Sequence, residues 1–179
     1  MKEEIVSWIK AIAIAFVLSL LMRQFIFTAT TVYGESMAPT FQSGDVVIVS
    51  KVNEINRSDM IVFDAPDSDE GELYIKRVIG VPGDSIEVRD DRLYINGKLV
   101  EEPYLEQNKQ NASLGYFTEN FTLDDYTGKS KVPEGYVFVM GDNRLISKDS
   151  RLIGFIALDK VIGEVVFRIY PLTSIDIPE

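Results

Sequence analysis

Hydrophobic and polar residues are arranged in two different ways along this 179-residue chain, and the first is a long apolar block near the N-terminus. Residues 5–27 are mostly apolar and include the uninterrupted run AIAIAFVLSLLM, which lies between Lys10 and Arg23. This run is shorter than the roughly 20 residues that span a bilayer, but both flanking charges can reach the headgroups on their long side chains. Trp8 and Phe25 would then lie near the two interfaces. The pattern predicts a membrane-spanning helix.

Two other interpretations of this block remain, a cleavable signal peptide and a buried helix of a soluble protein. The start MKEE is not clearly basic, and Arg23-Gln24 follow the apolar run where a signal peptide carries small residues. We therefore favour a retained anchor. The flanking charges indicate the orientation of this anchor only weakly, because Lys2 and Lys10 lie on one side of the apolar run and Arg23 on the other. The small excess of positively charged residues before the run slightly favours an N-terminus inside.

After the anchor, the pattern changes to short runs rich in Val, Ile, Tyr and Phe, separated by Gly, Pro, Asp and Ser, which is typical of strands. The segment IEVRDDRLYINGKLV adds two turn signals, Asp90-Asp91 and Asn96-Gly97, and the second is a strong hairpin signal. The last such run, EVVFRIY, would have to pair with a strand from much earlier in the chain, which predicts an antiparallel, partly closed sheet. The strands predicted outside that hairpin segment are Val46–Ser50, Met60–Ala65, Leu73–Val81, Tyr136–Met140 and Glu164–Tyr170.

These patterns divide the chain into two parts. Residues 1–27 are expected to form a short N-terminal tail and the anchor, and residues 28–179 a single β-domain. Within the β-domain, residues 101–131 are polar, with scattered aromatic residues and no clean period. We interpret this stretch as a surface excursion rather than a second domain.

Composition narrows the chemistry. The chain contains no His and no Cys, so a Ser/His/Asp triad and a Cys nucleophile are both excluded, as are thiolate and imidazole metal sites. The formal net charge of -10 and the lack of clustered Lys and Arg argue against nucleic acid as a partner. We expect no cofactor and no metal. Any nucleophilic catalysis must pair a hydroxyl with Lys or a carboxylate.

Ser36 and Lys76 are the candidate pair. In the predicted strand, alternation places Tyr74, Lys76 and Val78 on one face and Arg77 on the other. Burial of Lys76 would lower its pKa from about 10.4 toward the working pH, and a shift of 2 to 3 units corresponds to roughly 3 to 4 kcal/mol. A strand lysine can equally be an exposed edge residue.

Two further segments admit a purely structural interpretation. GESMAPT, which contains Ser36, is compatible with a plain turn whose serine is hydrogen bonded. GDNRLISKDSR is compatible with a polar turn. This segment contains several charged residues that could form ion pairs, which argues against a loop without a structural or functional role. These residues are Asp142, Arg144, Asp149 and Arg151.

Taken together, GESMAPT, SGDVVIV, YIKRVIGVPGD, YINGK and GDNRLISKDSR resemble, in order, the motifs of type I signal peptidases, specifically the small single-anchor form of Gram-positive bacteria. The resemblance covers most of the chain. It implies a membrane-anchored serine endopeptidase that removes signal peptides from exported preproteins at Ala-X-Ala-type sites through an acyl-enzyme. It also implies an N-terminus inside and a catalytic β-domain outside the cytoplasmic membrane, with preproteins and the lipid bilayer as partners.

The resemblance also implies roles for individual residues. Ser36 would be the nucleophile and Lys76 the general base, with the Ser147 hydroxyl orienting the base. Two ion pairs would support the site, namely Arg77 with Asp142 and Asp149 with Arg151. Shallow pockets for small side chains would be lined by Val32, Met37, Tyr74 and Ile75.

One position departs from the Gram-negative branch of the family, where a serine two residues before the nucleophile helps to bind the oxyanion. Here that position is Gly34, as is common in the Gram-positive branch. The oxyanion would then be bound by the backbone N–H of Ser36, with Gly34 at most a backbone contributor. Two alternatives stay open: a self-cleaving repressor-type Ser/Lys protease, whose processing arm is here replaced by the apolar block, and a membrane-tethered β-domain that binds exported chains without cutting them.

Overall fold

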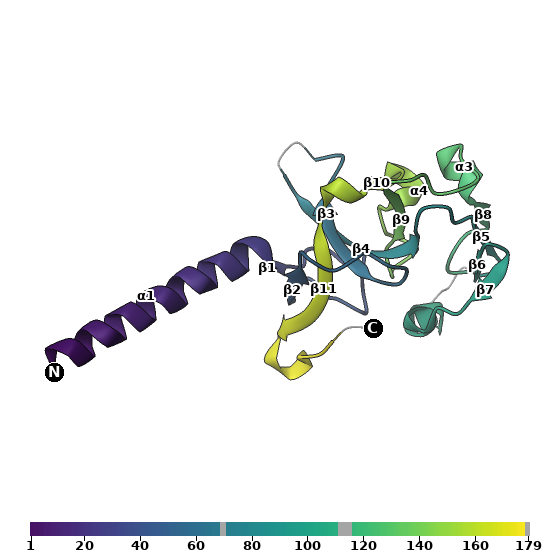
Figure 1. The fold of residues 1–179 in the computed structure, drawn as a ribbon. Coiled ribbons are helices and arrows are strands. Elements are labelled where there is room, and N and C mark those ends of the chain that lie inside the picture. Colours follow the sequence, from purple (N-terminus) through teal and green to yellow (C-terminus); the bar gives the residue numbers. More distant parts are fainter. Residues whose placement is uncertain (69–70, 111–115, 178–179) are drawn as a thin grey trace.

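The structure is a computed structural model that describes residues 1–68, 71–110 and 116–177. Helix α1, Lys2–Phe25, projects away from a β-rich domain that contains the rest of the described chain (Figure 1). Among the described residues, α1 is the one helix long and apolar enough to cross a membrane, and none of its apolar window is buried within the protein. The interpretation of this block as a buried helix of a soluble protein is therefore wrong.

The larger sheet is antiparallel throughout and has the strand order β1-β2-β11-β3-β4-β9-β10. The late strand β11 lies between β2 and β3, so it pairs far back along the chain as the sequence predicts. Register shifts along β11 mark bulges, which increase local twist. The strands are β1 Phe27–Thr31, β2 Val46–Ser50, β3 Met60–Asp64, β4 Leu73–Gly80, β9 Tyr136–Met140, β10 Ile156–Ala157 and β11 Val161–Tyr170.

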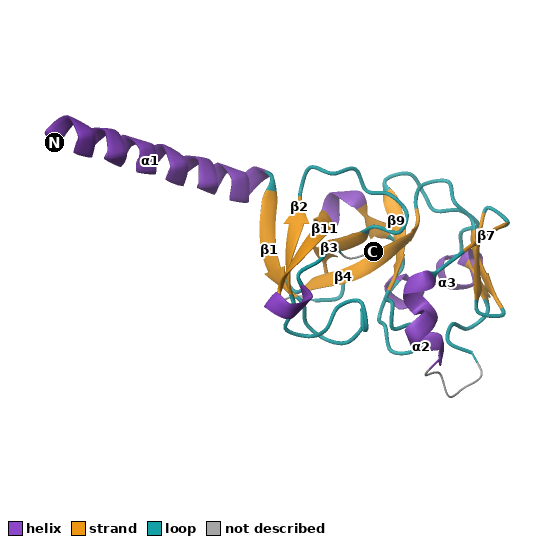
Figure 2. Ribbon diagram, turned by 90° about the horizontal axis from the view of Figure 1, so that it is seen from below, coloured by secondary structure: helices purple, strands orange, loops and turns teal. Residues whose placement is uncertain are grey.

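A second antiparallel sheet has the order β7-β6-β5-β8 and lies at the end of the domain opposite to α1 (Figures 1 and 2). The two predicted turns connect its first three strands, and Asp90, Asp91, Asn96 and Gly97 all have positive φ. This backbone conformation is the one that tight hairpin turns require. The strands are β5 Ile86–Arg89, β6 Arg92–Ile95, β7 Lys98–Val100 and β8 Phe121–Thr122.

The antiparallel, mainly β architecture is confirmed, but both sheets are open rather than closed. The short helices are η1 Pro103–Leu105, α2 Glu106–Gln110, α3 Leu123–Thr127, α4 Ser150–Ile153, η2 Leu158–Lys160 and η3 Leu172–Ser174.

Residues 101–131 are the expected surface excursion. In the described part of this stretch, Leu105, Phe121 and Leu123 are buried and β8 joins the second sheet. The division at residues 27 and 28 stays a prediction.

Strand β4 is the centre of the packing. Ile75, Val78 and Ile79 belong to three different clusters of buried hydrophobic residues, so both faces of this strand are covered. From Ile75 to Gly80 this strand is buried, and a buried strand holds its side chains in a fixed environment, whether they are apolar or charged. Lys76 and Arg77 lie in this strand, and both are buried.

Candidate active site

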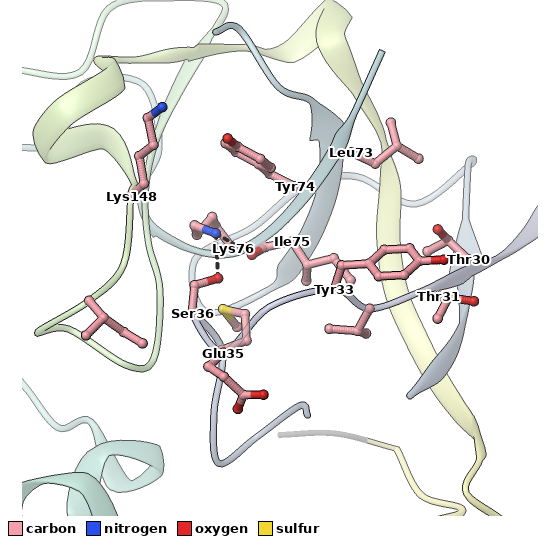
Figure 3. Close-up of a pocket in the computed structure, with 13 residues that line it drawn as sticks. Thr30, Thr31, Tyr33, Glu35, Ser36, Leu73, Tyr74, Ile75, Lys76 and Lys148 are labelled. Atoms are coloured by element: carbon pink, nitrogen blue, oxygen red, sulfur yellow. Dashed lines mark hydrogen bonds between the residues drawn. The ribbon is translucent and has the colours of Figure 1, made fainter. Parts of the chain in front are cut away.

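Ser36 and Lys76 lie in direct contact (Figure 3). Ser36 lies in the turn between β1 and β2, and Lys76 lies in the middle of β4. The Lys76 Nζ is 2.8 Å from the Ser36 Oγ and also donates to the carbonyl oxygen of Ile75 at 3.1 Å. The first distance is within the range in which a side-chain base can take a proton from a hydroxyl.

The surroundings of Lys76 favour its neutral form. Its side chain is only 3% exposed, and burial lowers its pKa from 10.5 to about 8, while the carboxylates of Asp149, Asp142 and Asp67 act in the opposite direction. Desolvation disfavours a charged amine because the protein interior cannot solvate it as water does. A substantial fraction of Lys76 is therefore unprotonated at slightly alkaline pH.

Two arginines hold the nearest carboxylates. Arg77 points to the opposite side of β4 from Lys76 and binds Asp142 through two hydrogen bonds, Nε to Oδ1 at 2.9 Å and Nη2 to Oδ2 at 2.7 Å. Arg151 binds Asp149 in the same forked manner, at 2.8 and 2.9 Å. Asp149 also caps the N-terminus of α4 and accepts from the backbone N–H of Gly141. The structure thus brings together both ion pairs that the sequence predicts.

Ser147 behaves differently from the expectation. Its Oγ is buried and has no hydrogen-bond partner among the described residues, so the expected bond to Lys76 is not formed in this conformation. Ser147 packs against Gly141, where an added Cβ would lie 2.2 Å from the Ser147 Oγ and 2.4 Å from the Ser36 carbonyl oxygen. Only glycine fits between these two segments. The role of Ser147 stays a prediction.

A cleft of about 230 Å³ surrounds the dyad. All four residues predicted to line pockets, namely Val32, Met37, Tyr74 and Ile75, do line it. Sequence reasoning missed the other lining residues, which are Thr30, Thr31, Tyr33, Glu35, Leu73, Ile146 and Lys148. In Figure 3, Lys148 and the Thr30–Thr31 segment lie on opposite sides of the dyad. Lys148 forms an ion pair with Asp67 of the β3–β4 connection.

The backbone around Ser36 is available for an oxyanion. Within the described residues, the N–H of Ser36 donates to no protein acceptor. Gly34 has a φ of 79°, in the left-handed region, and nothing lies within 4 Å of a Cβ built on it. Gly34 therefore permits the left-handed backbone of this turn, and no other part of the described chain crowds it.

Sequence reasoning also missed a group of residues behind the site. The sequence indicates Arg144 as a candidate for an ion pair but not its partner. In the structure, Arg144 Nη2 donates to Glu102 Oε1 at 2.5 Å. The ring of Tyr104 lies 3.9 Å from the guanidinium carbon of Arg77. Burial raises the pKa of the Tyr104 hydroxyl, and Glu102 raises it further. Glu102 and Tyr104 belong to 101–131, in which no motif signalled a link to the site.

The family model described as signal peptidase, peptidase S26, matches residues 5–170. The chain belongs to this family. The peptidase is similar to signal peptidase I of Bacillus caldolyticus, with 48% identity over 154 residues that cover 84% of this chain and 83% of that one. It is also similar to signal peptidase IB of Staphylococcus aureus strain COL, with 43% identity over 182 residues that cover 97% and 94% of the two chains.

Among solved structures, signal peptidase I of Enterococcus faecalis V583 matches this peptidase with a TM-score of 0.60 and 43% sequence identity, covering 64% of this chain and 98% of that one. The resemblance inferred from the motifs is thus confirmed. The chain is a serine peptidase of the type I signal peptidase family.

The buried amine should make stability depend on pH. The pKa of Lys76 is lowered to about 8 in the folded state and is about 10.4 in the unfolded state. Below pH 8, the need to protonate Lys76 in the folded state therefore lowers the free energy of unfolding by about 3 kcal/mol. This destabilisation disappears as the pH rises to about 10.5. We expect Lys76→Met to stabilise the protein by about 2 kcal/mol more at pH 7 than at pH 10. Denaturant unfolding of the detergent-solubilised chain, followed by circular dichroism at both pH values, measures the difference.

Lys98, an exposed strand lysine in β7 of the second sheet, serves as the control. Lys98→Met should change stability equally at the two pH values. An equal gain for Lys76→Met at pH 7 and pH 10 would show that Lys76 is not desolvated in the folded protein.

Proposed function

We propose that this peptidase removes N-terminal signal peptides from exported preproteins, cutting after a small residue through a Ser36/Lys76 dyad and an acyl-enzyme. The single observation that carries the proposal is the 2.8 Å contact between Ser36 Oγ and a Lys76 amine that is only 3% exposed. With no His and no Cys in the chain, a nucleophilic hydroxyl needs Lys or a carboxylate as its base, and Ser36 with Lys76 is the hydroxyl–lysine hydrogen bond found among the described residues.

Acylation would begin with neutral Lys76. As the Ser36 Oγ attacks the scissile carbonyl carbon, its proton moves to Lys76 Nζ, and the carbonyl oxygen becomes an oxyanion that the N–H of Ser36 can bind. When the tetrahedral intermediate collapses, the C–N bond breaks and the lysinium gives its proton to the leaving amine. The mature chain departs, and the signal peptide stays on Ser36 as an ester.

Deacylation would repeat the steps with water. Lys76, neutral again, takes a proton from a water molecule that attacks the ester carbonyl, and the lysinium then protonates the Ser36 oxygen as it leaves. The unpartnered Ser147 Oγ, buried against Gly141, is the hydroxyl that we assign to orient Lys76 during this cycle. A buried hydroxyl without a partner is costly, and a role in turnover accounts for its retention.

The cleft suits an extended peptide with small side chains. Val32, Met37 and Ile75 are buried side chains that line it, so they supply an apolar wall against which small side chains can pack. Strand β1 is an edge strand, and β9 pairs with β4 only from Arg77 onward, so residues 73–76 have no neighbouring strand on that side within the described chain. An extended signal peptide can hydrogen bond to such free edges while small residues enter the pockets.

Helix α1 would place the site at the membrane surface. We propose that it is a retained, single-pass anchor of the cytoplasmic membrane with the N-terminus inside and the β-domain outside. The exposed apolar side chains along its length support burial in lipid. Anchoring enzyme and preprotein to one membrane raises their effective concentration, which compensates for few and weak pocket contacts.

Cleavage of a preprotein by dyad variants tests this proposal. We expect the detergent-solubilised full chain to cut a labelled preprotein once, after a small residue, and Ser36→Ala and Lys76→Ala to lose at least about 10³-fold in kcat/KM because the nucleophile or its base is missing. Circular dichroism checks that the variants are folded. Undiminished cleavage by folded Lys76→Ala would refute the dyad, and binding without cleavage by the wild type would favour a tethered binding domain.

The pH dependence of kcat/KM provides an independent test. Because the active base is the neutral amine, kcat/KM should rise about tenfold per pH unit below pH 8 and level off above it. The Asp67 carboxylate raises the pKa of Lys76, so Asp67→Asn should move the midpoint to lower pH. A profile that is flat from pH 6 to pH 10 would contradict Lys76 as the base.

A further inference from the structure

Three segments of the chain meet behind Ser36. The turn that follows the nucleophile, residues 36–41, lies against the loop that follows β9, residues 141–147. The backbone N–H of Asn143 donates to the carbonyl oxygen of Ser36 at 3.0 Å, and the hydroxyl of Thr40 donates to Asp142 Oδ2 at 2.6 Å. The first of these bonds holds the nucleophile's own peptide group.

Asn108, in helix α2, joins the same two segments from a third. Its Nδ2 donates to the carbonyl oxygen of Ala38 at 2.8 Å and to the carbonyl oxygen of Asp142 at 3.0 Å. Both partners can only accept, so the amide nitrogen must face them, and it uses both of its hydrogens. A carboxylate of the same shape would bring an acceptor against two acceptors. The site therefore requires a side chain with two donors.

Helix α2 is itself attached to the framework of the site. It continues directly from η1, in which Leu105 is fully buried and Tyr104 stacks on Arg77. Glu102, one residue before η1, pairs with buried Arg144 of the 141–147 loop. The amide of Asn108 is thus presented from a segment that Tyr104 anchors to Arg77 and Glu102 anchors to Arg144, rather than from a free surface turn.

We propose that Asn108 is a positioning residue that clamps the Ser36 turn against the loop carrying Asp142. The inference rests on the proposed function, since it takes Ser36 to be the nucleophile. Without the clamp, the Ala38 carbonyl loses a donor two residues after Ser36, and the turn can shift relative to Lys76. Catalysis depends steeply on such alignment, because a misplacement of about 1 Å can lower a rate about 10²-fold.

Two variants at Asn108 and two matched controls at its neighbour test the clamp. Asn108→Asp keeps the shape but replaces the donors with acceptors, and Asn108→Ala removes the contact. Gln107→Glu and Gln107→Ala make the same changes of charge and size at an exposed position of the same helix. Steady-state cleavage by the full chain in detergent is compared with Ser36→Ala as the inactive reference, together with hydrogen–deuterium exchange of residues 36–41.

We expect both Asn108 variants to lose about tenfold or more in kcat with KM within about twofold of wild type, because alignment and not substrate binding is impaired. Exchange at the amides of Ala38 and Phe41, which bond within the turn, should be faster by about fivefold or more. The Gln107 variants should match the wild type in both measurements. Asn108→Asp should be at least as impaired as Asn108→Ala.

Wild-type kcat and wild-type exchange in Asn108→Asp would overturn the clamp, even where Ser36→Ala is inactive and the proposed function stands. A loss of kcat that only follows the folded fraction, with unchanged exchange in the folded protein, would also overturn it. A wild-type chain that does not cleave preproteins would refute the proposed function instead. The exchange rates would then still decide whether Asn108 holds the Ser36 turn.

Discussion

The burial of one amine beside one hydroxyl constrains the rest of this structure. Lys76 can act as a base near neutral pH only if it is removed from water and not neutralised by a carboxylate. Asp142 and Asp149 are both close enough to raise its pKa, yet each is held by an arginine through two hydrogen bonds. The ion pairs of Arg77 and Arg151 thus fix the loop geometry and direct the two carboxylates toward guanidinium groups rather than toward Lys76.

Strand β4 makes this arrangement possible because it is covered on both faces. Lys76 points toward the Ser36 turn, and Arg77, the next residue, points toward Asp142 on the other side. Strand β4 therefore places the base Lys76 in the cleft and, on its opposite face, Arg77, whose ion pair with Asp142 supports the site. The bare Cα of Gly141 lets the Ser36 turn approach the loop that carries Asp142, and Asn108 joins the two from the second sheet's end of the domain.

Local patterns predicted much of this structure. Runs rich in Val, Ile, Tyr and Phe predicted β2, β3, β4 and β9 to within one residue, and β11 without its first three residues. Asn96-Gly97 predicted its hairpin because positive φ has a clear residue signature. The motifs predicted that Ser36, Lys76 and the two ion pairs would lie together. Strands β1, β8 and β10 were missed, since each is short or directly follows another element. The partners Glu102 and Asn108 were missed because contacts between distant segments leave no local pattern.

Direct titration of Lys76 tests the central claim, that burial makes this amine a base. The chain labelled with ¹³C-lysine would be titrated in detergent by NMR, with the signal of Lys76 assigned by its loss in Lys76→Met. The account predicts a midpoint near pH 8 for this signal, well below the roughly 10.4 of a lysine in a model peptide. A Lys76 signal with a midpoint near pH 10.4, the value of a lysine in a model peptide, would contradict the account.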